Sequence, residues 1–313
     1  QLFALGGDGT HRGLLHILTA CMAAEYECAC VAVPATVNND IPLTDRTFGF
    51  DSACTVARDS LNAAYVEATC NANCIGLVKL TGLDNGFLTL EATLASRHVD
   101  ICLLPEMEIL LENVLDHCEA LMSTKGYAVV VLAEGCRRSL WRGVHSKATA
   151  SSEDPDVGTW FRDMILARFR SKDKALTIKY IDPTYTVRSG KPNAYDSVYS
   201  SNLACHAVHA ALAGLTGVSV VKVQGRYVYM PLQAVLNTTP KCLNPKGHRC
   251  ARMFFTTQQP SFEPEGHQYG PRTDGGLRTM STPLSLTDVF AKGAAVRRLC
   301  CVNLSESFAS KGV

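Results

Sequence analysis

The sequence contains no apolar run long enough to cross a bilayer. A membrane-spanning helix needs about 18 or more consecutive apolar residues, whereas the longest apolar runs here, such as 127–133, have the length of a buried strand. Charge of one sign is also lacking, because 30 basic residues face 29 acidic ones and the net charge is +1. Such a balance lacks the basic surplus of a nucleic-acid-binding surface and the acidic surplus of a disordered tail. The sequence therefore predicts a globular protein with no membrane span and no nucleic-acid partner.

Metal-ligand spacing is missing as well, although the chain has nine histidines and fourteen cysteines. The closest cysteine pairs, Cys28 with Cys30 and Cys300 with Cys301, fit no zinc motif. A disulfide framework suits a small secreted domain, whereas a chain of 313 residues can bury a core without one. Free cysteine is among the most frequently buried residue types. We therefore expect mainly reduced thiols in apolar surroundings.

The sequence does contain a regular alternation of strand-like and helix-like segments. An apolar stretch at 2–5 runs into the glycine-rich residues 6–10, and a helical pattern follows at 12–26. This order of strand, loop and helix is typical of a parallel α/β sheet. The further predicted strands are 30–33, 74–80, 101–104, 128–133 and 176–181, with a β pair at 217–223 and 226–230, and the further predicted helices are 52–68, 87–97, 110–125, 159–170 and 203–215.

The alternation is interrupted at two places. Residues 137–156 are polar and predict an irregular segment. From 237 to 285, proline, glycine and polar residues dominate. We expect this second segment to wrap a neighbouring subunit or to be partly mobile.

The segment Gly6-Gly7-Asp8-Gly9-Thr10 lies between the first predicted strand and the first predicted helix. A glycine-rich loop at such a point lets backbone N–H groups approach phosphate oxygens, and the helix N-terminus adds positive potential. An aspartate there would suit a magnesium ion that is bound together with phosphates. Taken alone, the motif fits a plain glycine turn at least as well.

Six further motifs occur in the same order, and about as far apart, as in one known family. They are 34–40 (Pro-Ala-Thr-Val-Asn-Asn-Asp), 46–50 (Arg-Thr-Phe-Gly-Phe), 78–82 (Val-Lys-Leu-Thr-Gly), 104–106 (Leu-Pro-Glu), 133–135 (Ala-Glu-Gly) and 179–185 (Lys-Tyr-Ile-Asp-Pro-Thr-Tyr). Over residues 1–235 the chain resembles the phosphofructokinases. It most resembles the long-type ATP-dependent enzymes of plants and trypanosome-like protists, which carry a similar Lys-Tyr-Ile-Asp-Pro-Ser-Tyr segment.

The resemblance implies an α/β fold of two similar three-layer αβα lobes with mostly parallel sheets. Residues 1–49 and 187–235 would form the nucleotide-binding lobe, 50–186 the sugar-phosphate lobe and 236–313 a C-terminal extension. An earlier glycine-rich segment of the family is absent, so we expect the N-terminal part of the nucleotide lobe to be missing. The resemblance also implies a homo-oligomer or a subunit of a hetero-assembly, in the cytoplasm or an organelle matrix.

Roles on the nucleotide side of the site follow from the resemblance by position. Gly9 and Ala35 stand where pyrophosphate-using members carry Asp and Lys, which favours an ATP-type site. The residues implied to hold the ATP phosphates are Gly6, Gly7, Gly9 and Thr10, and the residue implied to hold magnesium is Asp8.

On the sugar side, the resemblance implies a site for fructose 6-phosphate. The implied contacts are Thr36 and Asp40 beside the transferred phosphate and the sugar, Glu134 on the sugar, and Tyr185 and Arg188 on the 6-phosphate; Lys179 matches a basic phosphate contact that a neighbouring subunit gives. A guanidinium suits phosphate through its planar fork of donors.

Two departures from the family pattern fall on the chemistry. Asn38 stands at the position of the family's catalytic Asp, which takes the proton from the attacking sugar hydroxyl. An amide cannot accept that proton, and losing a general base typically costs about 10²- to 10⁴-fold in rate. In the segment that resembles the family's Met-Gly-Arg, Gly82 is kept, but Thr81 replaces Met and Leu83 replaces the substrate-facing Arg.

Two functional hypotheses follow, with a weaker third. The two losses favour a catalytically impaired phosphofructokinase homologue that serves as a structural or regulatory subunit of a larger assembly. An active ATP-dependent 6-phosphofructokinase, which would form fructose 1,6-bisphosphate in glycolysis and use ATP and magnesium, is favoured by the retained Asp8, Thr36, Asp40, Glu134, Tyr185 and Arg188. A sugar-phosphate sensor that binds ligand without turnover is the third.

Overall fold

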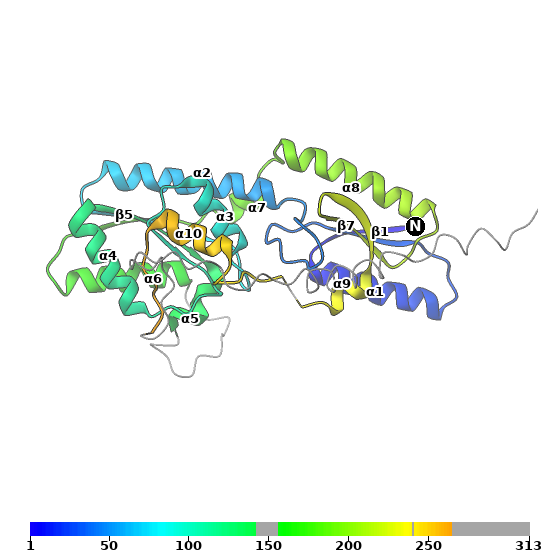
Figure 1. The fold of residues 1–313 in the computed structure, drawn as a ribbon, viewed down its shortest axis with the longest axis horizontal. Coiled ribbons are helices and arrows are strands. Elements are labelled where there is room, and N and C mark those ends of the chain that lie inside the picture. The colour runs from blue at the N-terminus through cyan, green and yellow to red at the C-terminus, as the bar shows by residue number, and fades with distance from the viewer. Residues whose placement is uncertain (142–155, 240, 265–313) are drawn as a thin grey trace, which may run out of the picture. The chain divides into compact units, whose positions relative to one another are not determined.

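The computed structural model describes residues 1–141, 156–239 and 241–264 (Figure 1). In this part of the chain the strands form two four-stranded sheets, in the orders β1-β2-β7-β8 and β4-β5-β3-β6. Every strand pair is parallel except β7–β8, which is antiparallel. The predicted α/β class with mostly parallel sheets is therefore confirmed.

The first sheet has helices on both faces. Its strands are β1 (Leu2–Gly6), β2 (Cys30–Pro34), β7 (Val218–Val223) and β8 (Arg226–Pro231), and its helices are α1 (Asp8–Ala23), α8 (Ala194–Leu212) and α9 (Leu232–Asn237). Alternate side chains of β2 point to opposite faces. Cys30 and Ala32 pack with Leu14 and Leu232 of α1 and α9, whereas Val31 and Val33 pack under α8. The result is a three-layer unit with α8 on one side of the sheet and α1 and α9 on the other (Figure 1).

The second sheet is buried more deeply. Its strands are β3 (Cys74–Leu80), β4 (Ile101–Leu103), β5 (Tyr127–Ala133) and β6 (Thr177–Ile181), and its helices are α2 (Phe50–Cys70), α3 (Phe87–Ser96), α4 (Leu111–Lys125), α6 (Val157–Arg170) and α7 (Thr184–Ser189). Every residue of β3 is buried, as expected for a central parallel strand covered on both faces. Gly76 lets α2 approach closely, because a Cβ there would lie 2.6 Å from the carbonyl oxygen of Ala64.

Several helices begin earlier than predicted, and the short helices α5 (Arg137–Trp141), α7, α9 and α10 (His248–Thr257) were missed. Helix α8 begins at Ala194 rather than at 203, because the Asn193 side chain caps it by accepting from the N–H of Asp196. Helix α1 begins at Asp8, directly after Gly7. The segment predicted to be irregular starts with the 3₁₀ turn Glu134–Cys136 and the helix α5 (Arg137–Trp141); residues 142–155 lie outside the described residues.

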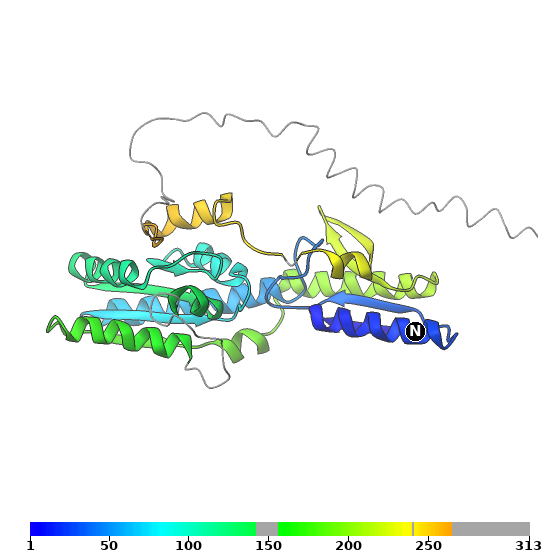
Figure 2. The same ribbon diagram turned by 90° about the horizontal axis from the view of Figure 1, so that it is seen from below.

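The C-terminal segment differs from the expectation of a loosely attached extension. Within 241–264 it contains α10 (His248–Thr257), and Leu243, Cys250, Met253 and Phe262 belong to the hydrophobic core of the second sheet. Figure 2 shows α10 lying along that part of the molecule. The rest of the predicted extension, 265–313, lies outside the described residues, and the division into nucleotide, sugar and C-terminal regions stays a prediction.

The described cysteines are free thiols, in line with expectation. Six of the twelve are buried, and burial raises the pKa of both Cys102 and Cys118 to about 12. Cys205, expected in an apolar context, is exposed; Cys300 and Cys301 lie outside the described residues. No helix in the described part of the chain is long and apolar enough to cross a membrane.

Candidate functional site

The loop between β1 and α1 presents an open helix N-terminus. Gly7 precedes the helix, and no described side chain caps this end. The carbonyl of Gly7 accepts from the N–H groups of Thr10 and His11, each at 3.1 Å. A Cβ at Gly6 would overlap the Thr10 side chain, so the turn requires glycine there. Uncapped N–H groups at the start of a helix suit a phosphate.

Three polar side chains, Asp8, His11 and Arg12, form contacts at this loop, and the sequence had pointed only to Asp8. Arg12 Nε donates to Asp8 Oδ2 at 2.7 Å, so the carboxylate implied to hold magnesium is engaged by a cation. His11 is fully buried and joins the Gly7 carbonyl (2.9 Å) to Ser219 Oγ on β7 (3.1 Å). Burial lowers the pKa of His11, which favours the neutral ring.

The loop after β2 lies directly beside the glycine-rich loop. The N–H of Ala35 donates to the Gly6 carbonyl at 3.1 Å, and a Cβ at Gly7 would lie 3.9 Å from the Cβ of Thr36. The structure thus brings together two segments that the sequence separates by some thirty residues. Both lie at the carboxyl edge of parallel strands, where ligands of α/β sheets bind.

Residues 36–47, here called the 36–47 loop, are held by their own side chains. Thr47 Oγ1 donates to the Thr36 carbonyl (2.7 Å), and Thr36 Oγ1 accepts from the N–H of Asn38 (3.2 Å). Asn39 has a left-handed backbone, and its buried Oδ1 accepts from the N–H of Thr47 (3.0 Å). Oδ1 of Asn38 and Oδ1 of Asp40 are buried without a hydrogen-bond partner among the described residues. Such acceptors are uncommon in native interiors, and a bound ligand or a water molecule would satisfy them.

A second group of predicted site residues meets at the edge of the second sheet. Gly82 follows β3 with φ = +142°, and its carbonyl accepts from the N–H of Gly135 at 2.9 Å. A Cβ at Gly135 would overlap the Leu83 carbonyl, so the two turns are in close contact. Leu83 and Glu134 therefore lie on adjacent turns. Thr81 is buried, whereas the Leu83 side chain is 58% exposed and offers no charge.

The residues implied to bind the 6-phosphate are not brought into contact with these two groups. Tyr185 and Arg188 lie on α7, and both are exposed, Tyr185 to 85%. Lys179 on β6 faces Glu67 of α2, with Nζ and Oε2 3.7 Å apart. In the described chain these side chains point to a surface rather than into a closed pocket.

An ion triad centred on the buried Lys79 of β3, which the sequence did not indicate, holds the segment that leads to α7. Lys79 Nζ lies 2.5 Å from Asp156 Oδ1 and 2.8 Å from Asp182 Oδ2. The Tyr180 hydroxyl donates to Asp156 at 2.6 Å. Burial opposes ionisation of Asp156, but the hydrogen bonds from Lys79 and Tyr180 prevail and lower its pKa.

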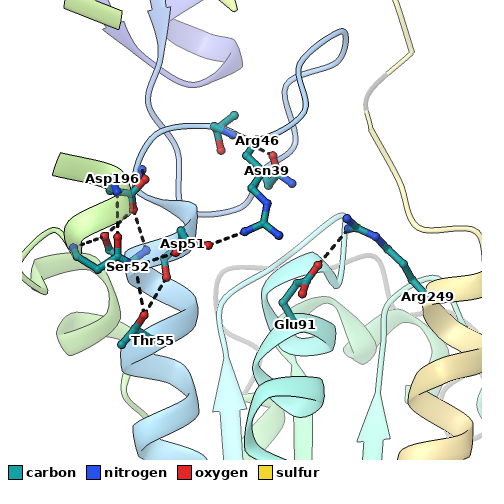
Figure 3. A network of polar contacts seen from close by, with 11 residues as sticks. Asn39, Arg46, Asp51, Ser52, Thr55, Glu91, Asp196 and Arg249 are labelled. Carbon is teal, nitrogen blue, oxygen red and sulfur yellow. Dashed lines mark hydrogen bonds and ion pairs between the residues drawn. The ribbon is translucent and has the colours of Figure 1, made fainter. Parts of the chain in front are cut away.

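A polar network also joins α8 to the start of α2 (Figure 3). The fully buried Asp196 accepts from the Ser52 N–H (2.8 Å), the Ser52 hydroxyl (2.5 Å) and the Gly49 N–H (3.3 Å). It thereby caps α2 from a helix far away in the sequence. Arg46 Nη1 reaches Asp51 at 2.5 Å in the same network. No three described His, Cys, Asp or Glu residues are grouped to hold a metal by themselves.

The family model for phosphofructokinase matches residues 1–211. Because the match covers more than half of the chain, the chain belongs to the phosphofructokinase family.

Curated relatives and solved structures agree with this family. The chain is 38% identical over 273 residues to ATP-dependent 6-phosphofructokinase 2 of Arabidopsis thaliana, covering 84% of this chain and 61% of that one. It is 34% identical over 236 residues to the ATP-dependent 6-phosphofructokinase of Trypanosoma brucei brucei, covering 74% and 48%. The chain thus spans only about half to three fifths of the length of such relatives.

The fold is shared with more distant structures. A pyrophosphate-dependent phosphofructokinase from Marinobacter aquaeolei superposes with a TM-score of 0.63 at 21% identity, over 88% of this chain and 70% of that one. Phosphofructokinase from Saccharomyces cerevisiae gives a TM-score of 0.65 at 17% identity, over 82% and 36%. At these identities the likeness shows the fold alone.

Proposed function

We propose that the chain is a catalytically impaired phosphofructokinase homologue that serves as a structural or regulatory subunit of a larger assembly. The observation that carries the proposal is residue 38. Its backbone is held in place by Thr36, but its side chain is an amide whose Oδ1 is buried without a described partner. The family pattern puts a catalytic Asp at this position, whereas an amide cannot remove a proton from a sugar hydroxyl.

The nucleotide side retains features that suit ATP and magnesium. The uncapped start of α1 and the Gly6 turn fit a phosphate group, so Gly6, Gly7, Gly9 and Thr10 would hold the ATP phosphates. Asp8 would contribute to a magnesium ion, which neutralises phosphate charge when bound. Because Arg12 already engages that carboxylate, metal binding would compete with an ion pair.

The second loss lies at the edge of the other sheet. Phosphoryl transfer relies on positive charge and donors aimed at the transferred group. Leu83 supplies neither, although it lies on a well-defined turn beside Glu134. The sugar contacts proposed from the family pattern therefore combine an intact acid, Glu134, with an apolar residue in place of a cation.

A second candidate is an active ATP-dependent 6-phosphofructokinase. It is favoured by Asp40, whose Oδ1 is buried and unpartnered among the described residues, two positions from Asn38. The names of the relatives also describe ATP-dependent enzymes, one of them chloroplastic. In either case we expect an oligomer in the cytoplasm or an organelle matrix.

Turnover of the native, full-length protein separates the two. We expect ADP formation that depends on fructose 6-phosphate to be at least about 10²-fold slower in the native protein than in the double variant Asn38→Asp/Leu83→Arg. Adding Asp8→Ala to the double variant is the control, and it should remove the gained activity. Native turnover near one per second, at the low end of typical enzymes, would instead establish the active candidate.

A further inference from the structure

One residue of the C-terminal segment makes four hydrogen bonds to the 36–47 loop. The backbone N–H of Lys241 donates to the Asp40 carbonyl at 3.2 Å. Its Nζ donates to the carbonyls of Asp45 (2.9 Å) and Thr44 (3.1 Å) and to Asn39 Oδ1 (3.4 Å). The bonded positions span both arms of the loop, so a single side chain ties the arms together.

The same segment is fixed on its other side to the turn that follows β3. The carboxylate of Glu106 accepts from the N–H of Leu243 (3.1 Å) and from the N–H of Gly86 (3.0 Å). Lys241 Nζ also lies 5.4 Å from the centre of the Phe87 ring, close enough for a cation–π contact. Lys241 therefore lies between the 36–47 loop and the turn that carries Leu83.

The charges around Lys241 leave its ammonium group without a matching carboxylate. Arg46 and Arg249 add positive potential, and each has its own carboxylate partner, Asp51 and Glu91 (Figure 3). Asp45 and Asp40 add negative potential, but within the described ranges neither forms an ion pair with Lys241. Burial lowers the pKa of Lys241 to about 8, and Arg249 adds to the effect.

We propose that Lys241 is a positioning residue of the candidate site, which holds the 36–47 loop so that residues 38 and 40 face the reacting groups. It acts through Asn39 and the loop carbonyls, since its described hydrogen bonds already occupy the donors of Nζ. The catalytic part of this inference rests on the proposed function. The structural part, that Lys241 holds the 36–47 loop in place, can be tested without any enzyme turnover.

The first test measures amide hydrogen exchange of the loop in the full-length protein. Lys241→Met keeps most of the aliphatic stem but removes the charge and the donors. Exchange within 38–47 should become about tenfold faster, the effect of losing one or two net hydrogen bonds. Lys241→Arg should restore protection in part. Arg252→Ala removes an exposed cation from α10 of the same segment and should leave the loop unchanged.

Unchanged exchange in Lys241→Met, or an equal increase in Arg252→Ala, would overturn the clamp. Protection of α4 serves as the folding control, because a variant that unfolds globally would lose it too. If Lys241→Met does not fold, Lys241→Gln gives the same comparison with a smaller loss of polarity.

The second test uses the Asn38→Asp/Leu83→Arg background. There, Lys241→Met should lower kcat about tenfold and change the KM for ATP less than twofold, because a loosened loop misplaces the base without removing a phosphate contact. An unchanged kcat would refute the positioning role. If the double variant itself proves inactive, the assignment of the impairment to residues 38 and 83 fails, while the exchange experiment still decides the clamp.

Discussion

The glycine-rich loop at 6–10 and the 36–47 loop lie side by side, yet they are built in different ways. The first is shaped by the absence of side chains: Gly6 has no room for a Cβ, and no side chain caps the helix that follows. The second is shaped by polar side chains, because Thr36, Asn39 and Thr47 bond to its own backbone and Lys241 closes it from outside.

Because of this difference, the backbone shape of the 36–47 loop does not depend on which side chain stands at the candidate catalytic position. In the 36–47 loop, the bonds that fix the backbone do not involve the side chain of residue 38. A substitution at 38 can therefore remove the general base and leave the loop intact. In the glycine-rich loop, the backbone atoms that would bind a phosphate also define the shape of the turn. A substitution that changes the shape of the turn therefore also changes the binding groups.

The largest effect should come from filling the glycine turn. Gly6→Ala places a methyl group inside the Thr10 side chain, so we expect a loss of about 3 kcal/mol in the free energy of unfolding, at the upper end for overpacking. Urea denaturation measures it. Gly9→Ala is the control, since a Cβ there meets nothing within 4 Å, and an equal loss in both variants would show that the turn is not sterically determined.

In the 36–47 loop, a substitution of Asn39 should lower the free energy of unfolding through two separate contributions. Asn39→Ala removes the acceptor for Thr47 and Lys241 and puts a Cβ residue without local support at φ = +56°. We expect a cost of about 2 kcal/mol, about 1 from the bond and about 1 from the backbone. Asn39→Gly should recover the backbone part alone. Equal unfolding free energies for the two variants would contradict this division.

A further effect should appear in alkaline solution. The pKa of Lys241 is about 8 in the folded chain and 10.5 for an unperturbed lysine, so the unfolded chain binds more protons between these values. Stability should therefore rise with pH from about 8 to about 10.5 in the native protein relative to Lys241→Met. Thermal melts of both proteins across this range measure the difference, and parallel curves would exclude a lowered pKa.

The smallest effect on stability should appear in acid, and it concerns His11 beside the glycine-rich loop. Burial lowers the pKa of His11 below 6.5, so below that pH the unfolded chain binds a proton that the folded chain refuses. The native protein should lose stability relative to His11→Gln as the pH falls below about 6.5. Melts at pH 7 and pH 5.5 provide the measurement, and an equal loss in both proteins would place the acid sensitivity elsewhere.

Much of the fold could be predicted from local patterns. β3 is predicted to the residue, and β1, β2 and β5 to within one residue, because short apolar runs bounded by turn residues are read from neighbours in sequence. The start of α8 was missed by nine residues, because its first turns are rich in polar residues and its beginning depends on the Asn193 cap. The candidate site residues were found by motif, and their roles stay predictions.

The supporting residues could not be found in this way. None of the sequence motifs described above contains Asp196, Lys241 or His11. Each of these residues forms a hydrogen bond with a residue more than 140 positions away in the sequence. An aspartate, a lysine or a histidine in an ordinary segment gives no local sign that it will be buried against a distant loop.

The sequence by itself determined the family and the parallel α/β class, and it predicted that Asn38 stands at the position of a general base, because these depend on residue identity and short-range spacing. Only the tertiary structure decided that Asn38 is held in a clamped loop, that the segment 241–264 packs on the second sheet and that Lys241 reaches the loop from there. The contacts of Lys241 with the loop join residues some two hundred positions apart, and long-range pairing is set by the packing of whole elements rather than by any local pattern.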